Sequence, residues 1–128
     1  MSLLLDTNIA YWWQIADPYI ERGARAAIET ELGEVFVSSV SLWELSIKIG
    51  TGKLRLDLPK FSAEVERLGF HWLPLSNRQI LRLSDLPSFS DHKDPFDRML
   101  IAQARTEHMT LLTSDAYLVR YGDFVRAV

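Results

Sequence analysis

Short apolar runs alternate with longer amphipathic stretches along this chain, and this alternation constrains the fold more than any other feature of the sequence. Each apolar run is typical of a buried strand, and each amphipathic stretch is typical of a helix. Strands that alternate with helices favour parallel pairing, because the intervening helix carries the chain back to the starting edge of the sheet. The sequence therefore predicts an α/β domain with a central, mainly parallel sheet.

The predicted elements follow from this pattern and from their flanking residues. The strands are expected at 3–5, 34–37, 70–73, 110–113 and 124–128. The helices are expected at 7–16, 18–32, 40–49, 60–69, 76–83 and 95–107. Asp17 and Pro18 form a typical helix start, and Gly33 a typical stop. The stretch 84–94 is polar and rich in turn-forming residues, so we expect a loop there.

Composition limits the functional classes. A length of 128 residues suits one domain, residues 1–128. The absence of cysteine excludes a disulfide scaffold, a thiolate zinc site and a cysteine nucleophile, and it fits a reducing compartment such as the cytoplasm. A formal charge of −3 argues against coating nucleic acid by bulk charge, but it leaves open a nuclease with an acidic metal site. The sequence has no basic start and no run of about 18 apolar residues. We therefore expect neither a secretion signal nor a membrane-spanning helix.

Four carboxylates stand where the apolar pattern does not favour them. Asp6 directly follows the first predicted strand, and Asp115 follows a later one. Glu44 interrupts a helix that is apolar nearly all round, and Asp97 lies in the first turn of the helix that begins at Pro95. Ligands of open α/β sheets bind at the carboxyl ends of the strands. Two strand ends and two helices can therefore bring these four acids together at one edge of the sheet.

Four carboxylates in one cleft repel one another, so either some are protonated or cations keep them ionised. Hard divalent ions such as Mg²⁺ and Mn²⁺ prefer oxygen ligands of this kind. One divalent ion halves the formal charge of the four acids, and two ions cancel it. Two ions about 3.5–4 Å apart can stabilise both oxygens in a phosphodiester displacement, with water as the nucleophile. The pattern therefore points to a metal site for phosphodiester chemistry.

Each acid also has an ordinary structural interpretation. Asp6 and Asp115 can each cap a following helix, and Asp94 can cap the helix at 95–107. Asp97, three residues after Asp94, can complete a capping box and at the same time favour the helix dipole. None of these acids singly indicates a site, whereas their order and their surroundings together do.

Glu44 is the acid for which a purely structural interpretation explains least. Its partner at the spacing of one helical turn is Lys48, and such a pair contributes only about 0.2–0.5 kcal/mol. That contribution cannot offset burial of the carboxylate among the apolar neighbours of Glu44. The helix context therefore favours a functional role.

Four short segments, spaced along nearly the whole chain, resemble the PIN-domain family and, within it, the VapC-like toxins of type II toxin–antitoxin pairs. They are Leu3–Asn8, Ser41–Lys48, Asp94–Ala104 and Leu111–Asp115, in the order in which the family has them. The resemblance implies a three-layer α/β/α domain with Mg²⁺- or Mn²⁺-dependent endoribonuclease activity. It is compatible with one or two bound ions.

The resemblance also assigns roles to individual residues. Asp6, Glu44 and Asp97 correspond to the first three family acids, and Asp115 to the fourth, which varies most between members. Thr113 matches a hydroxyl residue that supports the site. Asp94 is interpreted as a supporting residue, chiefly as a helix cap.

The partners implied by the resemblance are an RNA substrate, a small VapB-like antitoxin that covers the active groove, and a second copy of the chain in a homodimer. Cleavage by the family leaves a 3′-hydroxyl and a 5′-phosphate. Lys48 and Arg98 are candidate RNA contacts. A solvated basic loop is the simpler interpretation for Lys48, and pairing with a neighbouring acid is the alternative for Arg98.

Two other functions remain open from the sequence. One is a catalytically silent PIN-like binding module, although the presence of all four acids argues against it. The other is an aspartyl-phosphate phosphatase that uses Asp6 as its nucleophile, but such an enzyme needs a general acid two residues later, where this chain has Asn8. The three histidines, His71, His92 and His108, have no ligand spacing and are expected to be surface or packing residues.

Overall fold

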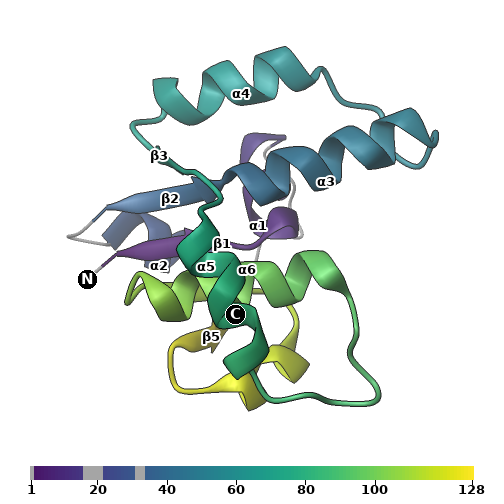
Figure 1. Ribbon diagram of the computed structural model, residues 1–128. Helices are drawn as coiled ribbons and strands as arrows, with labels where there is room; N and C mark the ends of the chain where they lie inside the picture. Colours follow the sequence, from purple (N-terminus) through teal and green to yellow (C-terminus); the bar gives the residue numbers. More distant parts are fainter. Residues whose placement is uncertain (1, 16–21, 31–33) are drawn as a thin grey trace.

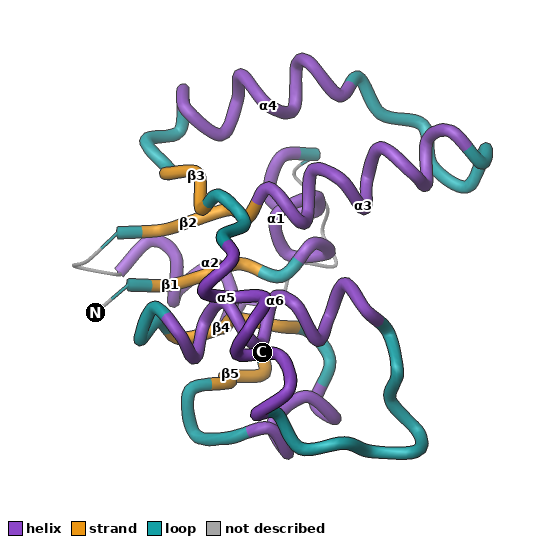
Figure 2. The backbone as a smooth tube through the Cα atoms, in the orientation of Figure 1, coloured by secondary structure: helices purple, strands orange, loops and turns teal. Residues whose placement is uncertain are grey.

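The computed structural model describes residues 2–15, 22–30 and 34–128. Its five strands form one sheet in which every pairing is parallel, in the order β3-β2-β1-β4-β5 (Figure 2). They are β1 (Leu3–Leu5), β2 (Val35–Ser38), β3 (His71–Leu73), β4 (Thr110–Thr113) and β5 (Val125–Ala127). The predicted α/β class is confirmed, and each predicted strand is present to within two residues at either end.

The helices agree with the sequence pattern except at two places. They are α1 (Thr7–Gln14), α2 (Arg22–Thr30), α3 (Ser39–Gly50), α4 (Leu58–Arg67), α5 (Asn77–Leu81) and α6 (Pro95–Thr106), with 3₁₀ turns η1 (Arg82–Asp85) and η2 (Ala116–Tyr121). The predicted helix start at Asp17 and Pro18 lies outside the described residues. Among the described helices, none is long and apolar enough to cross a bilayer.

The first difference is the start of α4, which we expected at residue 60. The helix begins at Leu58 because the Asp57 side chain caps it, accepting a hydrogen bond from the Lys60 amide at 3.1 Å. Pro59 therefore lies in the first helical turn, where a missing amide hydrogen costs nothing. The second difference is at 76–83, where α5 ends at Leu81 and the chain tightens into η1.

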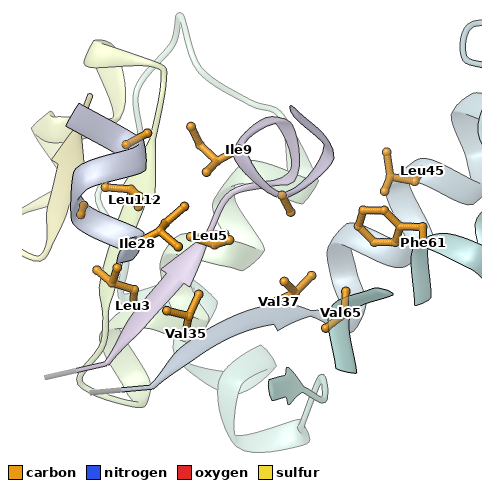
Figure 3. Close-up of a cluster of buried hydrophobic side chains, with 13 residues drawn as sticks. Leu3, Leu5, Ile9, Ile28, Val35, Val37, Leu45, Phe61, Val65 and Leu112 are labelled. Carbon is orange, nitrogen blue, oxygen red and sulfur yellow. The ribbon is translucent and has the colours of Figure 1, made fainter. Parts of the chain in front are cut away.

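Helices cover both faces of the sheet, as the three-layer expectation requires (Figure 1). Side chains of a strand point alternately to its two faces. Leu3 and Leu5 accordingly pack in one apolar cluster, and Leu4 packs in the other. Figure 3 shows the first cluster, in which the strands meet α1, α2, α3 and α4. The second cluster contains residues of α6, η2 and the start of α3.

The strand order determines where a site can form. From β1 the chain moves outward through β2 and β3, and it then returns to the other side of β1 to add β4 and β5. The direction of winding therefore reverses between β1 and β4, and ligands of open α/β sheets bind at the carboxyl ends of strands at such a point. Leu5 pairs with Leu112 in the register, so Asp6 and Thr113 follow side by side at that edge.

One buried polar network holds α6 to the rest of the fold, and the sequence pattern did not indicate it. Gln103 of α6 is fully buried among apolar residues. Its Oε1 accepts a 2.6 Å hydrogen bond from the Ser38 hydroxyl, and its Nε2 donates to Gln79 Oε1 at 3.0 Å. Ser38 caps α3 and Gln79 closes the capping box of α5. A single side chain thus joins the starts of two helices.

Replacing Gln103 with Met should lower the free energy of unfolding by roughly 1–3 kcal/mol, because the Ser38 hydroxyl and the Gln79 amide lose partners inside the core while the volume stays similar. Urea unfolding followed by circular dichroism measures the change. The matched control is Arg105→Met on the exposed face of the same helix, which should change stability by less than about 0.5 kcal/mol. Equal midpoints for the two variants would show that the network contributes nothing to stability.

Candidate active site

Asp6 connects the end of β1 to the start of α1. It is 6% exposed. Its Oδ1 caps α1 by accepting a 2.9 Å hydrogen bond from the Ile9 amide, and its Oδ2 accepts a short hydrogen bond from the Thr113 hydroxyl at the end of β4. The expected helix-capping role is thus present. The same carboxylate also bridges the two strands between which the winding of the sheet reverses.

Burial raises the pKa of Asp6 from 3.8 to about 6. The hydrogen bonds from Thr113 and the Ile9 amide lower the pKa, and the nearby charge of Asp97 raises it further. Desolvation disfavours the charged form, and at this buried position it outweighs the hydrogen bonds, which favour that form. The environment of Asp6 therefore favours either a proton or a cation at this carboxylate.

Glu44 reaches the same edge of the sheet from α3. Its carboxylate is buried and accepts a 2.7 Å hydrogen bond at Oε1 from the Thr7 hydroxyl, which also lies 2.9 Å from the Ser41 hydroxyl. Its Oε2 lies 2.9 Å from the ammonium of Lys48, as the one-turn spacing predicted. Contacts with both α1 and Lys48 explain how this acid can be buried in an otherwise apolar helix.

Asp97 lies in the first turn of α6, where Asp94 caps the helix by accepting hydrogen bonds from the amides of Phe96 and Asp97. The side chain of Asp97 does not close the expected capping box. Its Oδ2 lies 3.1 Å from His92 Nε2 instead. Burial raises the pKa of Asp97, the hydrogen bond from His92 lowers it, and the charges of Asp94 and Glu44 raise it.

These acids meet around one pocket of about 140 Å³. It is lined by Asp6, Thr7 and Asn8 from the β1–α1 junction, by Glu44 and Lys48 from α3, and by Asp94 and Asp97 from the start of α6. Four carboxylates thus surround a small polar cavity that holds a single ammonium. Glu44 lies on the same side of the sheet edge as Asp6 and Asp97, so three of the four predicted acids line one pocket, and Asp94 is its fourth carboxylate.

Asp115, the fourth predicted acid, lies outside the set of residues that line this pocket. Its carboxylate caps η2 by accepting a 2.9 Å hydrogen bond from the Tyr117 amide. Its own amide donates to the Thr113 hydroxyl at 3.0 Å. Thr113, predicted as a supporting residue, therefore joins the backbone of Asp115 to the carboxylate of Asp6.

The two candidate RNA contacts are placed differently. Lys48 lines the pocket while paired with Glu44. The guanidinium of Arg98 donates to the Pro87 carbonyl at 2.9 Å and to the Tyr121 hydroxyl at 3.2 Å. Arg98 thus binds a loop and η2, a role that differs from both interpretations of the sequence.

The donor set suits a hard cation bound partly through water. Among the described residues, no three acidic or histidine side chains are grouped closely enough to hold an ion by themselves. Mg²⁺ usually keeps several of its waters and takes only one or two carboxylates from the protein. The pocket is polar and lined by oxygen ligands, and burial disfavours an uncompensated charge on the Asp6 carboxylate. Both features fit that mode of binding.

Three residues of the site were not identified from the sequence. Thr7 and Asn8 line the pocket, and their position directly after Asp6 was the available signal. His92 contacts Asp97, although we expected a surface or packing residue. No sequence spacing indicated this contact, because it depends on how the loop before α6 folds back.

Comparisons with known proteins agree with this architecture. The chain is 29% identical to ribonuclease VapC22 of Mycobacterium tuberculosis over 119 aligned residues. The alignment covers 91% of this chain and 89% of that protein. Solved structures with a similar fold include VapBC2 of Rickettsia felis bound to a promoter DNA fragment, with a TM-score of 0.66, 17% identity and coverage of 100% of this chain and 98% of that one. A toxin–antitoxin complex from Klebsiella pneumoniae aligns with a TM-score of 0.67 and 18% identity over 98% of this chain and 96% of that one. The family model for the PIN domain matches residues 3–123, and the chain therefore belongs to the PIN domain family.

Proposed function

We propose that this chain is a single PIN-like domain that acts as a Mg²⁺- or Mn²⁺-dependent endoribonuclease, the toxin of a VapBC-like toxin–antitoxin pair. The convergence of Asp6, Glu44 and Asp97 on one pocket, at the edge where the winding of a PIN-family sheet reverses, carries the proposal. The name of the M. tuberculosis relative, a ribonuclease, supports the same activity.

Asp6, Glu44, Asp97 and Asp115 would hold the cation, directly or through water. When bound, such an ion offsets the charge of the acids and stabilises the oxygens of a phosphodiester displacement. The residues of the chain orient the carboxylates that would hold the ion. Thr113 and the Ile9 amide orient the Asp6 carboxylate, and Thr7 orients that of Glu44.

Water is the nucleophile in this proposal, because a bound divalent cation would activate it and no nucleophilic side chain is needed. Hydrolysis leaves a 3′-hydroxyl and a 5′-phosphate. Lys48, which lines the pocket beside the carboxylates, is the proposed contact for the phosphate of an RNA strand that enters the pocket. Single-stranded RNA is the expected substrate class, because its backbone and bases are accessible to a site of this size.

A VapB-like antitoxin and a second copy of the chain are the proposed protein partners. The solved structures with this fold include toxin–antitoxin complexes, which supports an antitoxin. The described surface carries large exposed apolar side chains, among them Trp43 at 57% and Leu81 at 75% exposure. An exposed tryptophan such as Trp43 is a favoured anchor in protein interfaces.

Removal of divalent cations should abolish cleavage of a single-stranded RNA oligonucleotide by the purified chain, because the pocket then has one ammonium to offset four carboxylates. Denaturing gel electrophoresis in EDTA, and again after addition of excess Mn²⁺, measures the loss and the recovery. A DNA oligonucleotide of the same sequence serves as the control substrate. Cleavage at an unchanged rate in EDTA would contradict metal dependence.

The same preparation separates the two alternatives. A silent binding module gives no cleavage under any condition and no Mn²⁺ binding at neutral pH in a titration. A phosphatase gives a phosphoaspartate at Asp6 that mass spectrometry detects after incubation with a phosphomonoester. The presence of Asn8 two residues after Asp6, where a phosphatase needs a general acid, makes the second result the less expected of the two.

A further inference from the structure

Asp97 is the last member of a chain of hydrogen bonds that begins at Arg98 and passes through η2. Arg98 Nη1 donates to the Tyr121 hydroxyl at 3.2 Å. The same hydroxyl lies 2.7 Å from His92 Nδ1, and His92 Nε2 lies 3.1 Å from Asp97 Oδ2. Both ring nitrogens of His92 are therefore occupied, one by η2 and the other by an acid of the pocket.

The chemistry of the two ends favours one direction for the whole chain of hydrogen bonds, because a guanidinium only donates and a carboxylate only accepts. The oxygen of Tyr121 accepts from Arg98, and its own proton is available for a further acceptor. The nearest acceptor for that proton is His92 Nδ1. An imidazole that accepts at Nδ1 carries its proton at Nε2 and donates it to Asp97.

The surroundings hold this arrangement in place. Tyr121 is 5% exposed, and its ring packs edge-on against Phe89 and His92. The isolated bridge between Phe89 and His92 closes the loop, and Arg98 binds the Pro87 carbonyl at the start of that loop. The loop before α6 is thus fixed at several points, and His92 cannot leave Asp97 without disturbing η2.

We propose that His92 is a positioning residue of the active site, held by Tyr121 and Arg98 in the tautomer with its proton at Nε2, so that it donates to one oxygen of Asp97 and fixes the orientation of that carboxylate toward the pocket. The proposal rests on the proposed function for its effect on catalysis. The tautomer itself is a property of the folded chain. Arg98 acts here as the anchor of the arrangement and not as an RNA contact.

The first test is the tautomer of His92, measured by two-bond ¹H–¹⁵N correlation NMR of the full chain at pH 8, where free imidazole is neutral. The expected spectrum has a protonated Nε2 and an unprotonated Nδ1. The variant Tyr121→Phe removes the proton that Nδ1 accepts, and it should shift the ring toward a mixture of tautomers. A protonated Nδ1 in the unmodified chain would overturn the proposal whatever the activity.

The second test is kinetic. His92→Leu should lower kcat for RNA cleavage by about 10–100-fold, the usual cost of losing a group that orients a ligand, while KM stays unchanged. His92→Gln, whose amide nitrogen can occupy the place of Nε2, should recover most of that loss. His71→Leu, at an exposed histidine in β3, should cleave at the rate of the unmodified chain.

The outcomes separate this proposal from the proposed function. If His92→Leu cleaves normally while Asp97→Asn is inactive, the positioning role is wrong and the nuclease assignment stands. If Asp97→Asn also cleaves normally, the assignment of the site itself is wrong. If His92→Gln is as impaired as His92→Leu, hydrogen bonding to Asp97 is not the reason for the loss, and the positioning role is again wrong.

Discussion

Asp6→Asn and Asp97→Asn are each expected to lower the rate of RNA cleavage by two to four orders of magnitude, about the range lost with an essential ionisable group of an active site. Both carboxylates line the same pocket. The charge of Asp97 raises the pKa of Asp6, and the charges of Asp94 and Glu44 raise the pKa of Asp97, so the acids of the pocket disfavour one another's ionisation. An amide retains the shape of the side chain but cannot carry the negative charge that a cation requires. Single-turnover cleavage of an RNA oligonucleotide measures the effect.

The fold should persist in both variants. Asn caps a helix about as well as Asp, so α1 keeps its cap in Asp6→Asn. The matched control is Asp123→Asn, an exposed acid in the turn before β5 that lies outside the pocket, and it should cleave at the rate of the unmodified chain. Cleavage by either site variant at that same rate would show that the four-acid assignment is wrong.

The second large expected effect is a loss of stability on raising the pH through the range of about 4 to 6 in metal-free buffer. The pKa of Asp6 is 3.8 in its ordinary state and about 6 in the fold, so the folded chain binds more protons than the unfolded chain between these values. Stability contributed by the protonated group is therefore complete below about pH 4 and is lost as the pH rises through the folded pKa. The shift corresponds to roughly 3 kcal/mol of unfolding free energy. Asp97, whose pKa is also raised, acts in the same direction.

Asp6→Asn provides the matched comparison for this effect. The variant has no charge to bury, so it should be more stable than the unmodified chain at pH 7.5 in EDTA and about equally stable at pH 4. Excess Mn²⁺ should then stabilise the unmodified chain more than the variant, because the cation binds the ionised carboxylate of the fold. Urea midpoints at the two pH values, with and without Mn²⁺, test these statements. A variant less stable than the unmodified chain at pH 7.5 would contradict the raised pKa.

The local elements were predictable because they depend on neighbouring residues. The leucine run 3–5 and the leucines of the run 110–113 alternate between the two apolar clusters, and helix starts follow short-range caps such as Asp6 and Asp94. The direction of the strands followed from the helices between them. The shift of α4 by two residues arose because a cap overrides the usual placement of a proline in a loop.

From the sequence, the site could be predicted only to the extent that strand ends and helix starts meet at one edge of the sheet. That geometry brought Asp6, Glu44 and Asp97 together as expected. The use of Gln103 to join two helix starts and the hydrogen bond from Thr113 to Asp6 depend on tertiary packing of residues far apart in the sequence. The contact of His92 with Asp97 depends on how the loop between them folds back. No periodicity encodes such contacts, so the sequence alone could not indicate them.

The hydrogen bond between Thr113 and Asp6 spans 107 positions of the chain, because β4 inserts beside β1 only after the other half of the sheet has been made. Protein synthesis proceeds from the amino terminus, so Asp6 leaves the ribosome long before the residue that orients it. A nascent chain therefore carries an unfinished pocket until Thr113 has emerged. The order of the strands by itself delays completion of the pocket until β4 has paired with β1.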